Sequence, residues 1–198
     1  MQRSFFEEEA TGLPPGMRFV PQFFSVEEGR AWLDVVASFD LQEAKYKEYT
    51  ARRRVVGFGG QFDYDTNELK PGKPIPSSLE PLRKRVAEWL GVEPGRFSQM
   101  LVAEYRPGTP LGWHRDVPDF ESIVGLSLLG SATMRFRPYP HVPGRSAKAF
   151  ELELPPRSAY VLEGDARWNW QHSIVATREL RYSITLRTRR GSAKLLSS

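Results

Sequence analysis

The feature that most restricts the fold is a series of about eight short strand-like segments after residue 97, with no helical pattern between them. Glycine and proline separate the segments, as expected for residues that interrupt regular structure. The segments are 98–105, 111–116, 122–129, 133–136, 149–154, 159–162, 172–175 and 180–188. Consecutive short strands without crossover helices favour an antiparallel jelly roll. We therefore expect a mainly β chain with flanking helices (α+β), with a double-stranded β-helix core over about residues 97–190.

Two helical segments precede these strands. Ser25 and Glu28 have the spacing of a capping box, which predicts a helix start. Its apolar residues recur at the intervals of one buried helix face: Trp32, Val35, Val36 and Phe39. A second helix is expected from a cap at Ser78 to about Leu90, with Gly91 as its C-cap. Its buried stripe is Leu79, Leu82, Val86 and Trp89. Both helices should pack on one sheet.

The rest of the chain is less regular. Residues 1–16 read as an irregular arm, 17–24 as a short strand, and 41–58 as one or two strands. Residues 189–198 read as a frayed tail. A chain of 198 residues suits one domain with a sizeable core, so we expect a single domain over 1–198.

Composition narrows the cellular setting and the partners. The chain has no cysteine, which excludes disulfides and thiolate metal sites. No apolar run approaches the roughly 20 residues of a membrane span, and the acidic first ten residues do not resemble a signal peptide. We therefore expect a cytoplasmic protein. We also expect it to act as a monomer. A net charge of +4 is compatible with a polyanionic partner, although the arginine clusters could equally be solvated surface.

One histidine and one aspartate in segment 111–116 suggest metal chemistry. On an extended strand, residues i and i+2 point to the same face, so His114 and Asp116 can converge. His172 supplies a second imidazole, and two His with one carboxylate form the facial triad of non-haem Fe(II) oxygenases. The alternative is that each histidine is a hydrogen-bonded polar residue. His141 has no carboxylate at a matching spacing and is left out.

The segment 181–187 adds an anion-binding pattern. Arg181, Ser183, Thr185 and Arg187 alternate with apolar residues and share one face of an extended strand. Two guanidinium groups inside a barrel require anions, and a dicarboxylate bound beside the metal would meet that requirement. The alternative is an edge strand with its arginines in water.

The segment from Phe58 to Tyr64 places aromatic residues close to Gly59 and Gly60, and a loop rich in Pro and Gly follows to Pro76. Such a segment could form a base-stacking lid over a site. It could equally be a glycine-rich hairpin whose aromatic side chains fill the core.

Taken together, these motifs resemble the AlkB family of Fe(II)/2-oxoglutarate-dependent dioxygenases. The family pattern of His-x-Asp, a distant His, and two Arg separated by five residues is met by His114, Asp116, His172, Arg181 and Arg187. The segment from Tyr105 to Gly108 matches the Tyr-x-Pro-Gly that precedes the metal strand in the family. Ser183 replaces the Asn of the family's Arg-x-Asn-x-Thr-x-Arg. The resemblance covers about residues 15–190.

The resemblance implies a full set of cofactors and site residues. Fe(II) would be bound by the catalytic residues His114, Asp116 and His172, with 2-oxoglutarate and O2 as cosubstrates. The residues implied for 2-oxoglutarate are Tyr105, Arg181, Ser183 and Arg187. Arg181 would take the far carboxylate, whereas Arg187 would help to hold Asp116. Phe62, Tyr64 and Trp113 are implied at the substrate, beneath a recognition lid over about residues 50–76.

The implied activity is oxidative demethylation of N-alkylated bases in DNA, with a single strand as the expected form and RNA as the other polymer. The alternatives are the same chemistry on a protein, lipid or small molecule, and a binding module without catalysis. Two positions depart from the family pattern. Ala103 replaces an Asn that contacts 2-oxoglutarate, and Pro118 replaces an acidic residue that reads the base.

Overall fold

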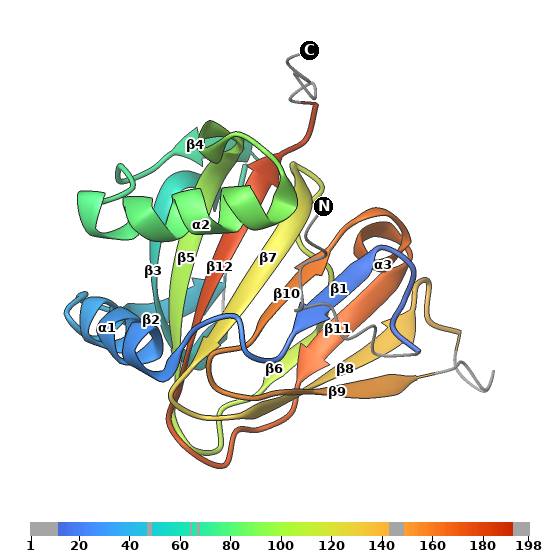
Figure 1. Cartoon of the computed structure of the whole chain (residues 1–198). Coiled ribbons are helices and arrows are strands. Elements are labelled where there is room, and N and C mark those ends of the chain that lie inside the picture. Colours follow the sequence, from blue (N-terminus) through green and yellow to red (C-terminus); the bar gives the residue numbers. More distant parts are fainter. Residues whose placement is uncertain (1–11, 47–48, 64, 67, 143–148, 192–198) are drawn as a thin grey trace, which may run out of the picture.

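The computed structural model describes residues 12–46, 49–63, 65–66, 68–142 and 149–191, and within them the strands form two antiparallel sheets (Figure 1). The larger sheet has the order β1-β10-β7-β12-β5-β3-β2, with β4 paired to β3. Its strands are β1 (Met17–Val20), β2 (Gln42–Tyr46), β3 (Tyr49–Asp63), β4 (Glu68–Pro71), β5 (Phe97–Tyr105), β7 (Phe120–Leu128), β10 (Ala159–Leu162) and β12 (Arg181–Arg189). The smaller sheet has the order β6-β11-β8-β9. Its strands are β6 (Leu111–His114), β8 (Ala132–Pro138), β9 (Phe150–Leu154) and β11 (Trp170–Ile174).

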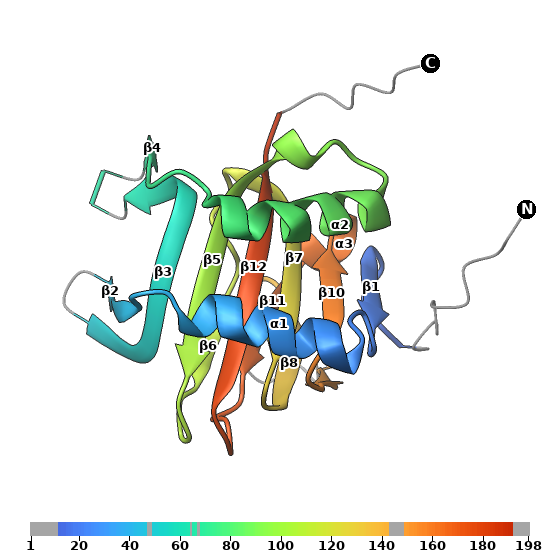
Figure 2. The same cartoon turned by 60° about the vertical axis from the view of Figure 1, so that its left-hand side comes forward.

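The helices lie mainly on one side of this framework. Figure 2 shows α1 (Val26–Ala37) and α2 (Glu80–Leu90) running across the outer face of the larger sheet. Short turns of 3-10 helix, Ser77–Leu79 and Pro94–Arg96, flank α2, and α3 (Gly164–Trp168) connects β10 to β11. The predicted jelly roll with two N-terminal helices on one sheet is therefore confirmed.

Two hydrophobic clusters account for this layering. The first joins the helices to the larger sheet and includes Val36, Leu82, Val86, Met100 and Ile184. The second lies between the two sheets and includes Phe120, Ile123, Met134, Phe136 and Leu154. Because side chains alternate along a strand, one face of β12 serves the first cluster and leaves the other face for the space between the sheets.

The helix ends show where local signals were sufficient and where they were not. The capping box is present: Ser25 Oγ accepts from Glu28 N–H at 3.1 Å, and Glu28 Oε2 accepts from Ser25 N–H at 2.7 Å. Gly91 ends α2 with φ 66°, as expected for a left-handed C-cap. The predicted cap at Ser78 is wrong. The 3-10 turn occupies residues 77–79, α2 begins at Glu80, and no side chain caps it.

Segment boundaries also differ from the prediction in the N-terminal half. The first strand ends at Val20 rather than at Phe24, because the chain turns there toward α1. Residues 41–58 do form two strands, but β3 continues to Asp63 and pairs with β4 in a hairpin. Gly59 has φ 79°, and a Cβ at that position would lie 2.1 Å from Ser98 O, so only glycine fits there.

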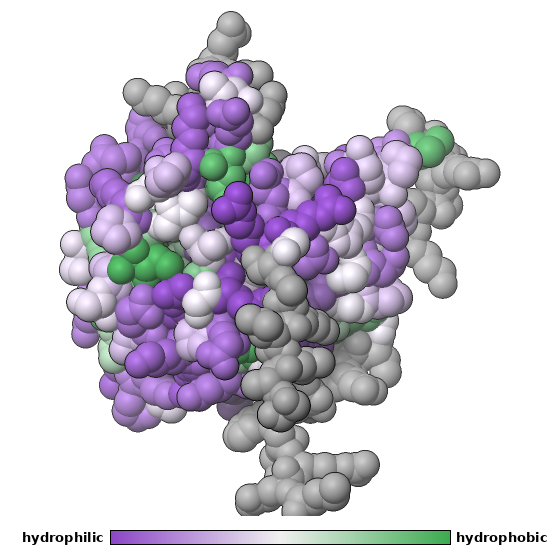
Figure 3. All heavy atoms as spheres, turned by 90° about the horizontal axis from the view of Figure 1, so that it is seen from above, coloured by the Kyte–Doolittle hydropathy of each residue, from purple (hydrophilic) through white to green (hydrophobic). Residues whose placement is uncertain are grey.

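None of the helices in the described part of the chain combines the length and apolarity needed to cross a bilayer. The face shown in Figure 3 is mainly hydrophilic, and its hydrophobic residues form small, separate groups.

Candidate metal and cosubstrate site

The three predicted metal ligands meet between the sheets. His114 ends β6 and His172 lies on the adjacent β11, where the two residues are Cα partners in the strand register. One potential ligand atom from each of His114, Asp116 and His172 lies within 4.8 Å of the others. The pairing of β6 with β11 fixes both imidazoles on the inner face. Their ring centroids are 4.3 Å apart.

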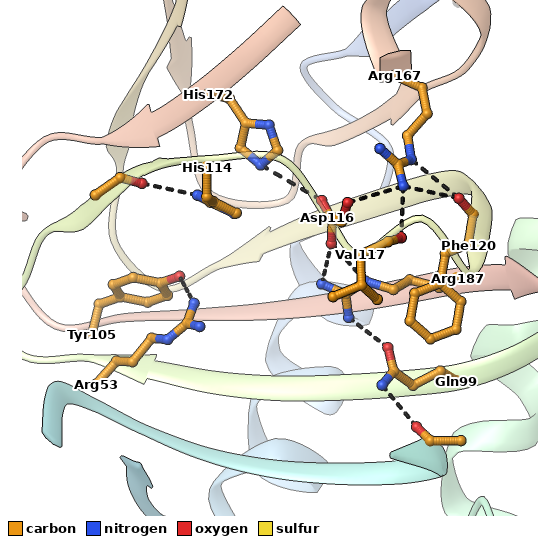
Figure 4. Close-up of polar contacts among 12 residues, drawn as sticks. Arg53, Gln99, Tyr105, His114, Asp116, Val117, Phe120, Arg167, His172 and Arg187 are labelled. Atoms are coloured by element: carbon orange, nitrogen blue, oxygen red, sulfur yellow. Dashed lines mark hydrogen bonds and ion pairs between the residues drawn. The ribbon is translucent and has the colours of Figure 1, made fainter. Parts of the chain in front are cut away.

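Asp116 reaches the site by a different route from the one the sequence suggested. The strand ends at His114, so Asp116 lies in the following loop and the i, i+2 rule for strands does not place it. Its carboxylate instead meets Arg187, whose Nε donates to Oδ1 at 2.7 Å and whose second nitrogen lies 2.6 Å from the same atom (Figure 4). Gln99 accepts from the remaining Arg187 nitrogen at 2.8 Å and donates to Gly60 O at 2.7 Å.

A buried arginine holds the loop that carries Asp116. Arg167 of α3 is 2% exposed, and its guanidinium donates to the backbone carbonyls of Asp116, Val117 and Phe120 at 2.8–3.2 Å (Figure 4). These bonds supply donors to backbone carbonyls between the end of β6 and the first residue of β7. Arg167 therefore positions the one ligand that lies outside the sheet.

The protonation states suit a divalent cation. Burial, followed by the neighbouring His114, lowers the pKa of His172 to about 3, so the imidazole is neutral. Burial also lowers the pKa of His114, whose Nδ1 donates to Gly112 O at 2.9 Å and leaves Nε2 free to bind a metal. Burial alone would raise the pKa of Asp116, but Arg187, His172 and His114 outweigh it and keep the carboxyl ionised. Two neutral imidazoles and a carboxylate are the donor set of the Fe(II) facial triad.

The metal ligands and Arg181 line one cavity, and the part of it around Arg181 is suited to a carboxylate ligand. Arg181 is 2% exposed, and among the described residues no carboxylate lies within 4.0 Å of it. Its Nε donates to Ser127 Oγ at 2.9 Å, and its guanidinium carbon lies 5.1 Å from the centre of the Tyr105 ring. Because a buried guanidinium without a counter-ion is costly, the geometry fits an anionic ligand such as 2-oxoglutarate.

The predicted alternation of β12 is present. Arg181, Ser183, Thr185 and Arg187 all line a cavity of about 1120 Å³, whereas Tyr182, Ile184 and Leu186 belong to the core beneath the helices. Ser183 is the register partner of Ala103, which also lines the cavity. The alternative of an edge strand is wrong, since β12 lies between β7 and β5.

The predicted substrate residues fall into different positions. Phe62 lines the cavity from the β3–β4 hairpin, whereas Phe58 is buried in the core, as the alternative of a hairpin with core-filling aromatic side chains expects. Trp113 borders the cavity, but its ring lies under the guanidinium of Arg137, at 4.3 Å. Tyr64 lies outside the described residues, and Pro118 is exposed.

Several residues in the cavity were not singled out from the sequence. Arg53 belongs to one of the arginine clusters for which solvated surface was an alternative, but it is buried, and its guanidinium lies 3.4 Å from the Tyr105 hydroxyl. Tyr160 also lines the cavity, and burial raises the pKa of its hydroxyl. Gln99 acts on Asp116 through Arg187, and Arg167 of α3 acts on the backbone carbonyl of Asp116. For Gln99 the sequence did hold a signal, namely a polar residue within a mainly apolar strand.

The fold and this site define a 2-oxoglutarate- and Fe(II)-dependent oxygenase. Residues 16–190 match the 2OG-Fe(II) oxygenase superfamily, and the chain belongs to it. The cofactors of this superfamily are Fe(II), 2-oxoglutarate and O2, and the residues described above fit them.

Within this superfamily the chain is homologous to AlkB-type proteins. It is 33% identical over 172 residues to "tRNA (carboxymethyluridine(34)-5-O)-methyltransferase ALKBH8" of Macaca fascicularis. The matched region is 84% of this chain and 25% of the relative. It is 32% identical over 182 residues to "Alkylated DNA repair protein ALKBH8 homolog" of Arabidopsis thaliana, which covers 81% of this chain and 51% of that protein. The chain thus spans about a quarter to a half of the length of these curated relatives.

Solved structures show the same fold at lower identity. The structure of OsALKBH1 superposes with a TM-score of 0.66 at 16% identity, covering 89% of this chain and 99% of that one. A Pseudomonas putida prolyl-4-hydroxylase superposes with a TM-score of 0.60, also at 16% identity, covering 89% of this chain and 94% of that one. At this identity the likeness concerns the fold.

Proposed function

We propose that this oxygenase oxidatively demethylates N-alkylated bases in nucleic acid, with single-stranded alkylated DNA as the first substrate and RNA as the second. The reaction releases formaldehyde, succinate and CO2. The observation that carries the proposal is the single cavity that contains the metal triad, Arg181 and the aromatic side chain of Phe62. Its volume of about 1120 Å³ is sufficient for 2-oxoglutarate and one nucleobase together.

The relatives support a nucleic-acid substrate but differ in the polymer. The Arabidopsis thaliana relative has alkylated DNA repair in its name, whereas the Macaca fascicularis relative is named for tRNA. The net charge of +4 is consistent with either polymer. RNA therefore enters as an equal arm of the test, although DNA is the substrate that the sequence motifs predicted.

In the proposed mechanism, the bound iron, O2 and 2-oxoglutarate supply the oxidation of the methyl carbon, and the chain supplies position and charge. His114, Asp116 and His172 would hold the metal, since their potential ligand atoms lie within 4.8 Å of one another, and three protein ligands leave positions for cosubstrates. Arg181 and Tyr105 would hold the far carboxylate of 2-oxoglutarate, with Ser183 beside them, and Arg187 keeps Asp116 oriented. Phe62 covers the base, and Trp113 lies at the cavity border.

We further propose that residues 1–198 form one oxygenase domain that acts as a monomer in the cytoplasm, with 50–76 as its recognition lid. Within the described part, β5 to β12 provide the ligands, and the β3–β4 hairpin adds Phe62 to the cavity. The absence of cysteine is consistent with a reducing compartment.

The test is mass spectrometry of methylated DNA and RNA oligonucleotides after incubation with Fe(II), ascorbate and 2-oxoglutarate. We expect loss of one methyl mass in at least one polymer, with one succinate formed for each methyl group removed. Asp116→Ala should abolish both products while the protein stays folded. Iron-dependent succinate release with no change in any oligonucleotide would refute the nucleic-acid substrate and favour a protein, lipid or small molecule. Absence of succinate under all conditions would favour a non-catalytic module.

A further inference from the structure

A group of arginine and aromatic side chains lies on the outer face of the smaller sheet, next to the cavity. We call this group the outer strip and define it as Trp113, Arg115, Arg135, Arg137 and Tyr139. The guanidinium carbons of Arg137 and Arg135 lie 4.3 and 5.2 Å from the centre of the Trp113 ring. That of Arg115 lies 3.5 Å from the centre of the Tyr139 ring.

The strand register explains why this strip lies beside the metal site. His172 pairs with His114 on one side and with Phe136 on the other, and these three side chains face inward. The neighbouring pairs, Gln171 with Arg137 and Ser173 with Arg135, face outward because side chains alternate. Trp113 precedes His114 on β6, the edge strand of this sheet, and so joins the outer face at the cavity border.

The arginines of the strip are fixed in place but not neutralised. Among the described residues, none of Arg115, Arg135 and Arg137 has a carboxylate within 4.0 Å. Arg137 Nε donates to Gln171 Oε1 at 2.9 Å, and Arg115 donates to the Trp168 carbonyl at 2.7 Å. A guanidinium already held against a ring loses little conformational freedom when it binds an anion.

The charge of the outer face is asymmetric. Glu151 and Glu153 of β9 pair in register with Arg135 and Thr133 and are exposed. The positive charge is therefore confined to β6, β8 and the residues that follow these two strands. A polyanion on this face would follow the β6 side and avoid β9.

We infer that the outer strip binds the sugar–phosphate backbone of the nucleic-acid strand on one side of the base that enters the cavity. This inference rests on the proposed function, since it assigns the path of the same substrate. The nucleic-acid strand crosses the β6 edge of the sheet. Its phosphates contact Arg115, Arg135 and Arg137, and the exposed Tyr139 ring is available to a neighbouring base. The partner is a single strand because splayed bases are required for stacking on a protein surface.

The test is the salt dependence of binding, measured by fluorescence anisotropy with labelled single-stranded DNA and RNA oligonucleotides. The protein is loaded with 2-oxoglutarate and with Mn(II) instead of iron, so that no turnover occurs. Each phosphate contact on a single strand contributes about 0.7 to the slope of log affinity against log salt, so Arg135→Gln with Arg137→Gln should reduce the slope by about 1.4. Arg135→Lys with Arg137→Lys keeps the charge and should keep the slope. The matched control, Arg30→Gln with Arg178→Gln, removes two exposed charges elsewhere and should leave the slope unchanged.

The outcomes separate the two proposals. If the native protein binds neither polymer, the nucleic-acid function fails and the strip has no ligand. If it binds with a salt-dependent affinity that the Gln pair does not change, the function stands and the strip assignment is refuted. If the control pair lowers the slope as much as the Gln pair does, binding is diffuse and the assignment is also refuted. Mn(II) and 2-oxoglutarate binding by each variant, measured by calorimetry, confirms that the cavity is intact.

Discussion

Replacing Arg167 by methionine should loosen the metal ligand Asp116 without touching the metal. The guanidinium makes four hydrogen bonds to three backbone carbonyls, those of Asp116, Val117 and Phe120. Methionine fills similar space but removes these four hydrogen bonds, after which the Val117 carbonyl keeps only the backbone N–H of Phe120, at 3.3 Å. Hydrogen bonds from a charged group contribute about 1.5–3 kcal/mol each, and part of that is returned because a buried charge is removed, so we expect a loss of about 3–5 kcal/mol of unfolding free energy.

That loss corresponds to a fall in Tm of about 6–20 °C for a chain of this size. Groups that orient a metal ligand typically change metal affinity by about 10–100-fold, so the dissociation constant for Mn(II) should rise by that factor. Calorimetric titration with Mn(II) at a temperature where both proteins are folded measures it. Arg190→Met is the control, because the guanidinium carbons of Arg167 and Arg190 lie 4.2 and 4.8 Å from the centre of the Trp168 ring, but no side-chain hydrogen bond joins Arg190 to these carbonyls. Unchanged Mn(II) affinity in Arg167→Met, with the expected fall in Tm, would show that the loop keeps Asp116 in place by itself.

Three further predictions concern other parts of the cavity. Arg181→Ala should raise the 2-oxoglutarate concentration needed for half-maximal succinate release by at least about 100-fold, since truncating a buried charged partner costs several kcal/mol; an unchanged requirement would assign the carboxylate to another residue. Gly125→Ala should displace the Tyr160 ring, whose Cζ lies 2.2 Å from the added Cβ, and so weaken 2-oxoglutarate binding measured by calorimetry; equal binding would show that the ring can move aside without cost. The metal-free protein should lose stability as pH falls from about 6.5 toward 3. This follows because the pKa of His172 is about 3 when folded and 6.5 when unfolded, so the unfolded state binds the extra proton. A urea midpoint that is the same at pH 7 and pH 5 would contradict it, and His172→Gln should weaken the dependence.

The metal site was predictable because its signals are local. His-x-Asp, a later His and an alternating strand with two arginines can each be read within a few residues, and the register of β6 with β11 brings them together. The same alternation correctly placed Arg181 and Arg187 inside the cavity. The reason given for Asp116 was wrong, since a two-residue spacing cannot show where a strand ends.

Residues that act across long separations were not predictable in this way. Arg167 holds the 116–120 loop from about 50 positions later in the chain, and nothing near it in sequence marks its partners. Arg53 lies in a run of three arginines, where burial depends on which residue faces the cavity. The start of α2 was missed for a related reason: Ser78 is a good capping residue, but the chain forms a 3-10 turn there and Pro81 follows in the first turn of the helix.

The three metal ligands are held by different physical means, and this difference has a consequence. His114 and His172 lie on adjacent strands, so backbone hydrogen bonds of the sheet fix their separation whatever the side chains nearby. Asp116 follows the end of β6 and has no strand partner, so side chains from β12 and α3 must hold it. Arg187 fixes its carboxylate and keeps it ionised, whereas Arg167 fixes its backbone. Substitutions around the site should therefore reach the metal mainly through Asp116, because it is the ligand whose position the sheet does not determine.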